Sequence, residues 1–101
     1  MNDFVFEGKE LYRDDRVLIC KSTQGEGHDM LINHNYISLP RGTLQEMATS
    51  NPDNIERMYN NIISPVTGLS LDDLEISPTE LGWDMAKAKN KELLECLFSK
   101  Y

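Results

Sequence analysis

The sequence predicts an α+β fold, in which a small antiparallel sheet from the N-terminal part is covered on one side by C-terminal helices. Apolar segments rich in β-forming residues fall within residues 3–39, whereas helical periodicity and helix caps appear only from residue 43 onward. Because the strands all precede the helices, a parallel β-α-β arrangement is disfavoured. A chain of 101 residues can bury one modest core, so we expect a single domain over 1–101, strand-rich over 3–39 and helix-rich over 43–100.

Three apolar segments predict the first strands. Phe4-Val5-Phe6 consists of strand-forming residues, and Leu11-Tyr12 resumes the pattern before the polar corner at 13–16. Val17-Leu18-Ile19-Cys20 is apolar at successive positions, which indicates a central strand buried on both faces.

The next two apolar segments, at 30–32 and 36–39, flank Asn33-His34-Asn35. Asparagine tolerates the left-handed backbone region, so a tight hairpin at this triplet is one interpretation. A single unbroken strand is the other.

Two helices are predicted after the strands. Thr43-x-x-Glu46 has the form of a capping box and indicates a short helix near 43–50. Asn51 as the N-cap and Pro52 at the first helical position predict a helix over 52–63. Its buried side is predicted from apolar residues at helical spacing, namely Ile55, Met58, Tyr59, Ile62 and Ile63. Pro65 is expected to end this helix, with a turn at 65–68.

The last helix is predicted near 78–99, where Ser77-Pro78-Thr79-Glu80 combines a cap, a first-turn proline and an acid. Its apolar residues fall on two sides, because Leu81, Met85 and Ala88 gather on one side and the later ones lie opposite. The later ones are Leu93, Leu94, Leu97, Phe98 and Tyr101. We expect a break near Asn90, and one long helix that uses two faces is the alternative. Residues 71–76 fit either a short helix capped by Ser70 or an edge strand.

Cys20 and Cys96 stand far apart without a paired spacing, so we interpret both as reduced, buried thiols. No metal site, cofactor or catalytic residue is predicted. No apolar run approaches the roughly 20 residues of a membrane span, and the first residues resemble no secretory leader. We therefore expect a cytoplasmic location.

The charge of the chain bears on its partners. There are 17 acids against 10 Lys and Arg, which gives a formal net charge of −7. Such a field repels nucleic-acid phosphate and anionic membranes, and it attracts basic proteins. We therefore expect no direct contact with nucleic acid or membrane, and the sequence leaves the oligomeric state open.

The predicted partner-binding site lies where acids surround the single tryptophan. A tryptophan provides a large contact area at little entropic cost, and carboxylates can pair with Lys or Arg of a partner. The predicted site comprises Asp72, Asp73, Glu75, Glu80, Trp83 and Asp84.

These features favour a non-enzymatic protein that inhibits or neutralises a basic protein, such as a nuclease toxin or a nucleic-acid-processing protein. In size and composition the chain is similar to small acidic immunity proteins and phage inhibitors, which offer carboxylates where phosphate would bind. One alternative is a small transcriptional or translational regulator that uses residues 70–91, including Lys87, Lys89 and Lys91. Another is a small hydrolase-like enzyme with His28 or His34 as general base beside Glu26 or Asp29.

Overall fold

The computed structural model describes residues 8–23 and 25–98, and it confirms the predicted α+β fold. Four antiparallel strands form one sheet in the order β1-β2-β3-β4, so each strand pairs with its neighbour in sequence. The strands are β1 (Glu10–Arg13), β2 (Val17–Lys21), β3 (His28–Ile32) and β4 (Asn35–Leu39). The predicted strand at Phe4–Phe6 lies outside the described residues.

The central, fully buried strand predicted at 17–20 is confirmed as β2. Val17 and Ile19 belong to the core cluster with the helices, and Leu18 and Cys20, on the opposite face, are buried as well. Cys20 is a free thiol whose pKa is raised by burial, as expected for a structural cysteine. The side chain of Cys96 lies outside the described part of the chain.

The hairpin interpretation of 33–35 is confirmed. β3 ends at Ile32 and β4 begins at Asn35, which leaves Asn33 and His34 as a two-residue turn. Both take positive φ, 47° and 72°, as a type I′ turn requires. The Asn33 side chain also donates to the Leu74 carbonyl at 2.6 Å, so the hairpin tip is attached to the helical layer.

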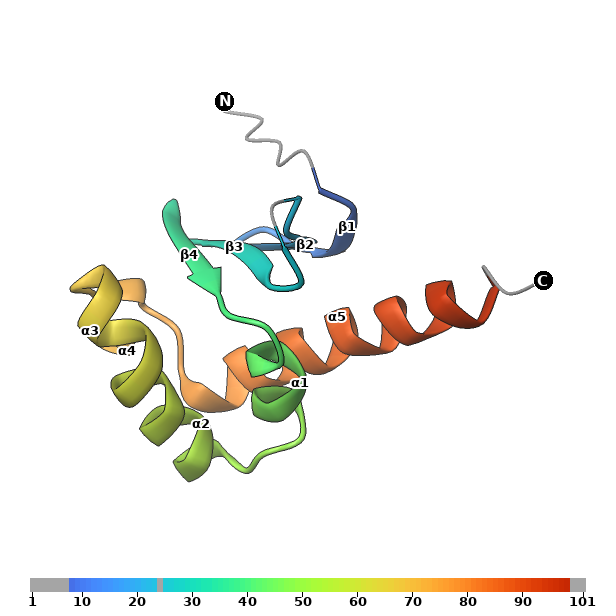
Figure 1. Cartoon of the computed structure of the whole chain (residues 1–101). Helices are drawn as coiled ribbons and strands as arrows, with labels where there is room; N and C mark the ends of the chain where they lie inside the picture. The colour runs from blue at the N-terminus through green and yellow to red at the C-terminus, as the bar shows by residue number, and fades with distance from the viewer. Residues whose placement is uncertain (1–7, 24, 99–101) are drawn as a thin grey trace.

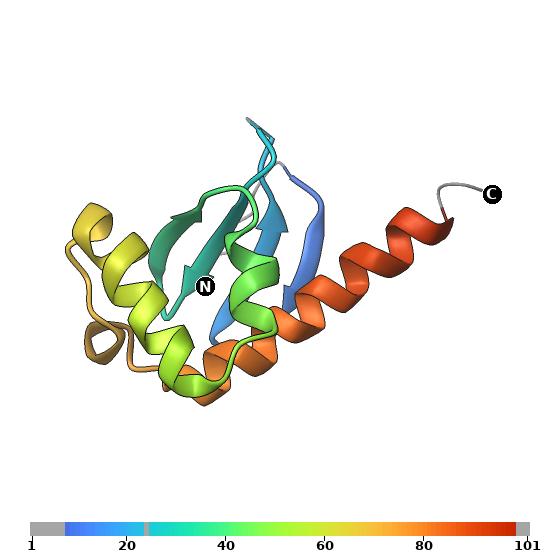
Figure 2. The same ribbon diagram turned by 60° about the horizontal axis from the view of Figure 1, so that its bottom comes forward.

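All helices lie on one side of the sheet (Figure 1; Figure 2). Tyr59, Met30 and Met85 lie between the layers without solvent contact, and the Tyr59 hydroxyl donates to the Leu69 carbonyl at 2.8 Å. Burying one such side chain contributes roughly 1.5–3 kcal/mol. The helical elements are α1 (Thr43–Ala48), α2 (Pro52–Met58), the π-helical segment η1 (Tyr59–Ile63), α3 (Ser64–Thr67), α4 (Leu71–Leu74) and α5 (Pro78–Phe98).

The predicted capping box at Thr43 is wrong. Gly42 is the N-cap, with a φ of 82° that favours glycine, and Thr43 is already the first helical residue. The Glu46 amide donates to the Gly42 carbonyl, and no side chain caps the helix. The caps predicted at Asn51 and Ser77 are confirmed, because each accepts a hydrogen bond from the amide three residues later.

The predicted end of the second helix at Pro65 is also wrong. Proline lacks the N–H that an α-helical bond to residue 61 would need, and the wider π-helical turns of η1 lie just before it. The chain therefore continues through α3 and ends at Gly68, whose φ is 73° and whose N–H donates to the Ser64 carbonyl.

The break expected near Asn90 is absent, because α5 is one continuous helix from Pro78 to Phe98. No Gly or Pro occurs between Trp83 and Phe98, and Ala, Lys, Glu and Leu predominate there, so helix propensity is high. Of the alternative interpretation, the single long helix is confirmed, but a second face on the core is not, because Leu93, Leu94 and Leu97 are about half exposed. The C-terminal half of α5 extends beyond the other helices (Figure 2).

Candidate functional site

α4 exposes three of the six predicted site residues. Leu71 and Leu74 are buried against the core, whereas Asp72, Asp73 and Glu75 are exposed. We call these three carboxylates the acidic corner. Within the described part of the chain none of them forms a salt bridge, so their charge is available to a partner.

A complete capping box holds the acidic corner in place. The Ser70 hydroxyl accepts from the Asp73 amide at 3.2 Å, and the Asp73 carboxylate accepts from the Ser70 amide at 2.9 Å. This arrangement confirms the helical interpretation of residues 71–76. Glu75 then ends α4 with a φ of 57°, which turns the chain toward α5.

Glu80 has its own partners inside the molecule. Its carboxylate pairs with the Arg16 guanidinium at 2.5 Å, and it accepts from the Ser77 hydroxyl at 3.0 Å. These contacts, led by the one to Arg16, hold the pKa of Glu80 below its ordinary value. Glu80 therefore anchors the start of α5 to the β1–β2 turn.

Asp84 is only 6% exposed and faces β1. Burial is the main reason that its pKa is raised, and the nearby Asp14 carboxylate adds to the effect. Tyr12 lies between these two acids and donates to Asp14 at 2.9 Å. This hydrogen bond, together with burial and the two carboxylate charges, raises the pKa of Tyr12 to about 12. Lys87 lies over the Tyr12 ring, 5.3 Å from its centroid. Asp84 thus belongs to a packed polar cluster rather than to an open surface.

Trp83, in contrast, is 65% exposed. On the inner sides of α5, Leu81 and Met85 are buried in the core, and Gly82 approaches α2 so closely that an added Cβ would lie 2.7 Å from Ile55 Cδ1. Helical spacing of about 100° per residue places Trp83 on the side facing away from both.

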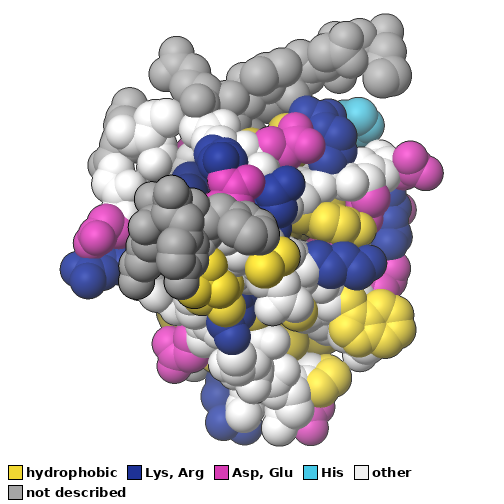
Figure 3. Space-filling model, turned by 90° about the vertical axis from the view of Figure 1, so that its right-hand side faces the viewer, with side chains coloured by type: hydrophobic (Ala, Val, Ile, Leu, Met, Phe, Trp, Pro, Cys, Tyr) yellow, Lys and Arg dark blue, Asp and Glu magenta, His cyan; other side chains and the backbone are white. Residues whose placement is uncertain are grey.

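The outer side of α5 carries further apolar residues in line with Trp83. Leu93, Leu94 and Leu97 are each about half exposed. Figure 3, which looks toward the C-terminal end of α5, shows hydrophobic side chains at the surface among Lys and Arg. We name as the outer row the residues at alternating spacings of three and four, which are Trp83, Ala86, Asn90, Leu93 and Leu97. The sequence shows the two-sided distribution, but it does not show which side the sheet covers.

The histidines of the enzyme alternative do not converge. His34 is exposed at the hairpin tip, whereas His28 begins β3 at the other end of the strand and is 1% exposed. Their predicted companions have other partners, since Glu26 pairs with Arg41 at 2.9 Å and Asp29 accepts from the Tyr36 hydroxyl at 2.8 Å. The described residues contain no group of three His, Cys, Asp or Glu that could hold a metal ion.

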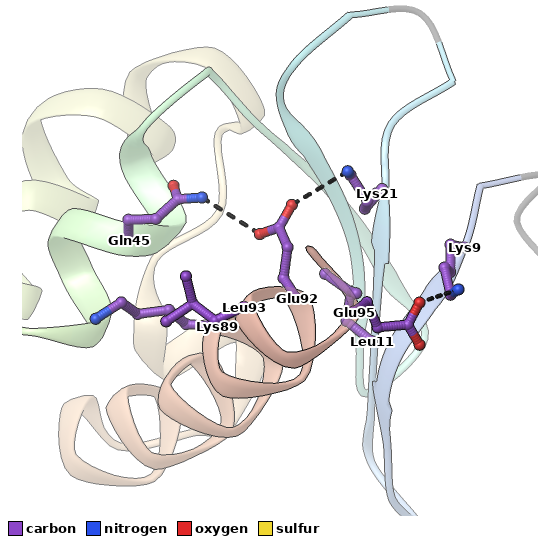
Figure 4. Close-up of a pocket in the computed structure, with 8 residues that line it drawn as sticks. All are labelled: Lys9, Leu11, Lys21, Gln45, Lys89, Glu92, Leu93 and Glu95. Atoms are coloured by element: carbon purple, nitrogen blue, oxygen red, sulfur yellow. Dashed lines mark hydrogen bonds and ion pairs between the residues drawn. The ribbon is translucent and has the colours of Figure 1, made fainter. Parts of the chain in front are cut away.

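A cavity of about 450 Å³ lies between α5, α1 and the β1–β2 edge (Figure 4). Glu92 projects from α5 between Lys21, at 3.5 Å, and the Gln45 amide, at 3.3 Å. The same carboxylate lies 3.1 Å from His28 Nε2, and Glu95 pairs with Lys9. These contacts hold the second half of α5 against the sheet edge. The lining residues are Lys9, Leu11, Lys21, Gln45, Lys89, Glu92, Leu93 and Glu95.

The three lysines of the regulator alternative do not form one patch. Lys87 packs over Tyr12, Lys89 lines the cavity, and Lys91 lies 3.9 Å from Glu95. On the helix, Lys89 falls on the α1 side, and the other two face the β1 side.

Comparison of the chain with models of known protein families, with curated proteins and with solved structures finds no match. Among the described helices, none has the length and apolar character needed to cross a membrane. The functional argument therefore rests on the side chains above.

Proposed function

We propose that this protein binds another protein through the outer side of α5 and the adjacent acidic corner, and thereby inhibits or neutralises a basic partner. The observation that carries this proposal is the exposure of Trp83 at the head of a half-exposed apolar row. Burying an exposed tryptophan side chain in an interface contributes a large favourable free energy. Exposed aromatic residues are therefore typical binding hot spots.

The acidic corner supplies the charge preference. Asp72, Asp73 and Glu75 have no salt bridge within the described residues, and they precede α5 by only a short loop. Carboxylates held in this way attract Lys and Arg and accelerate encounter with a basic protein. Phosphate also presents anionic oxygens to Lys and Arg, so the carboxylates of the corner can bind basic side chains that otherwise bind nucleic acid. The class of partner that we propose is therefore nucleases and nucleic-acid-processing proteins.

The contribution of Glu80 and Asp84 is different from that of the corner. Both carboxylates already have interactions with β1 or the β1–β2 turn, so they position α5 and need not contact the partner. The proposed contact residues are therefore Trp83 and the three acids of the corner.

Co-purification from the source cells tests the proposal. We would tag the full chain, identify the proteins that remain bound, and compare Trp83→Ala with Val66→Ala. Val66 is 85% exposed on α3, so its variant is a matched control for the loss of an exposed apolar side chain. We expect a partner with an isoelectric point above about 8, retained by the wild type and the control and lost with Trp83→Ala. A partner that the Trp83 variant retains unchanged would contradict the proposal.

A further inference from the structure

The cavity between α5, α1 and the β1–β2 edge has no part in the proposed function. Its volume of about 450 Å³ is within the range of roughly 300–1,000 Å³ that is typical of small-molecule sites. Glu92 of α5 connects its three walls, because this carboxylate contacts Lys21 on the sheet and Gln45 on α1. The cavity is therefore formed before a ligand binds, which lowers the cost of binding.

The two carboxylates of the cavity are already occupied by groups of the protein. Glu92 Oε1 lies 3.1 Å from His28 Nε2 and 3.3 Å from Gln45 Nε2. Its Oε2 lies 3.5 Å from the Lys21 ammonium. The second carboxylate, Glu95, pairs with a lysine of its own. A cationic ligand would have to displace one of these contacts, so the cavity does not favour a cation.

The lysines of the cavity outnumber these carboxylates by one. Two of its three lysines pair with its two carboxylates, whereas Lys89 forms no salt bridge with any residue that the structure describes. The lining thus has a formal charge of +1, although the whole chain carries −7. This local excess of positive charge favours an anion with a single charge.

The remaining lining residues, apart from Gln45, are apolar. Leu11 of β1 is buried and Leu93 of α5 is half exposed. Lys89 and Leu93 are one helical turn apart, and both line the cavity (Figure 4). The methylene stems of the lysines add to the apolar surface, because lysine can lay its stem along apolar groups while its ammonium stays in water. An apolar ligand body that covers this surface would bind favourably.

We propose that the cavity binds a small organic monoanion in which one carboxylate is joined to an apolar chain, and that Lys89 is the cation that selects it. The ligand carboxylate lies against the Lys89 ammonium, and the apolar chain lies along Leu93. The carboxylate thereby gains a charge-assisted contact without breaking any ion pair of the protein. An inorganic anion would leave the apolar wall uncovered, and a neutral apolar molecule would leave Lys89 without a partner.

Titration of the full chain with hexanoate at pH 7 and constant ionic strength tests this inference. Two-dimensional NMR spectra should show saturable shifts at the Lys89 and Leu93 amides and at the Gln45 side-chain amide. We expect a dissociation constant on the order of 5 mM for so small a ligand. The matched probes 1-hexanol and hexylamine have the same chain without the negative charge, and they should bind at least about 5-fold more weakly. Absence of saturable shifts up to about 50 mM hexanoate, or equal binding of all three probes, would overturn the inference.

A neutral variant tests the role of Lys89. Lys89→Met keeps most of the stem but loses the charge, so it should weaken hexanoate binding at least about 5-fold and leave 1-hexanol binding unchanged. Lys87→Met is the matched control, because it removes the same charge from α5 at a residue that packs over Tyr12 and does not line the cavity. It should bind hexanoate as the wild type does. Hexanoate affinity that Lys89→Met leaves unchanged, or that falls equally in both variants, contradicts the proposal.

A charge reversal provides a second, independent test. Lys89→Glu should bind hexylamine more tightly than hexanoate, and a variant that still prefers hexanoate would count against Lys89 as the selecting cation. Circular dichroism identifies a variant that has failed to fold, and if Lys89→Met does so, Lys89→Glu replaces it. Trp83→Ala should bind hexanoate normally, because Trp83 lies outside the cavity. The ligand site and the proposed function can therefore fail separately.

Discussion

His34 illustrates how a single residue can be interpreted chemically or conformationally. It is exposed at the second position of a two-residue turn, where its φ is 72°. Residues other than Gly adopt this backbone region uncommonly, and Asn, Asp and His do so more often than the rest. In a type I′ turn the sequence Asn-Gly is the favoured pair, and here His34 occupies the glycine position.

We therefore predict that His34→Gly raises the free energy of unfolding by about 0.5–1 kcal/mol, because it relieves a strained backbone position. Urea unfolding measures the change. His34→Ala is the matched control, since it removes the imidazole but keeps the Cβ, and it should give no gain. A gain of equal size with alanine would show that the imidazole, rather than the backbone, is unfavourable.

Asp84 shows the opposite situation, a carboxyl group whose burial is unfavourable when it is charged. Its folded-state pKa is raised above the unfolded value, so the folded protein binds a proton at Asp84 more readily than the unfolded chain does. Its contribution therefore favours folding at low pH and becomes unfavourable as the pH rises through the unfolded and then the folded pKa.

From this sign we predict that Asp84→Asn raises the free energy of unfolding at pH 7, where the wild-type carboxyl group is charged although it is buried. The gain should shrink as the pH falls toward about 4, the ordinary pKa of an aspartic acid. Urea unfolding at a series of pH values measures it. A gain that is independent of pH would mean that packing rather than charge is responsible.

At the scale of the elements, α5 depends on contacts at both ends. Glu80 holds its start to Arg16, and Glu92 holds its second half to the sheet edge. The Glu92 contact is the more demanding, because His28 is buried and its Nε2 has this carboxylate as partner. Removing the partner of a buried polar atom costs about 1–3 kcal/mol.

We predict that Glu92→Ala lowers the free energy of unfolding by about 1–3 kcal/mol and increases amide exchange in the second half of α5. Glu92→Gln keeps an acceptor for His28 and should recover much of the loss. Glu95→Gln is the control, because its salt bridges are more exposed and such pairs contribute about 0–1 kcal/mol. Equal losses of unfolding free energy for the variants at Glu92 and Glu95 would indicate that the contact with His28 contributes no more than an exposed salt bridge.

Local signals predicted those elements that are stabilised locally. The caps at Asn51 and Ser77, and the hairpin at Asn33-His34, depend on a few adjacent residues. The errors arise where a local signal has a competing local outcome, as at Thr43, where Gly42 is the N-cap instead. At Pro65 a π-helical segment lets the helix continue, and at Asn90 strong helix formers keep the chain helical although its apolar side changes.

The candidate site was predicted only in part, because its side chains depend on contacts that are distant in sequence. Sequence order places Glu80 and Asp84 beside Trp83, but their directions depend on β1, which lies more than 60 residues earlier. Periodicity revealed two apolar sides on α5. Which side faces water follows from the docking of the sheet, and no local pattern encodes that.

At the scale of the whole molecule, the effect of the net charge of −7 on a partner depends on where the unpaired acids lie. Glu80, Glu92 and Glu95 neutralise cations within the fold, whereas the acidic corner does not. Long-range attraction of a basic partner should therefore depend on which acids are removed as well as on how many.

We predict that the double variant Asp72→Asn, Glu75→Gln slows association with a basic partner and reduces its dependence on salt. It changes the net charge from −7 to −5, and it retains Asp73 for the cap. Glu46→Gln with Glu56→Gln removes two other exposed acids and gives the same net charge. Stopped-flow association rates measured from low to high salt compare them, and equal slowing by both pairs would mean that only the total charge matters.

The sheet order described above also bears on how the chain folds. Because β1 to β4 pair only with sequence neighbours, each pairing closes a short loop, which is kinetically favourable. The contacts of Arg16 with Glu80 and of His28 with Glu92 each span 64 residues. Docking of α5 should therefore be a late event. Mutations at its contacts should then mainly accelerate unfolding, whereas mutations in the β2–β3 hairpin should slow refolding.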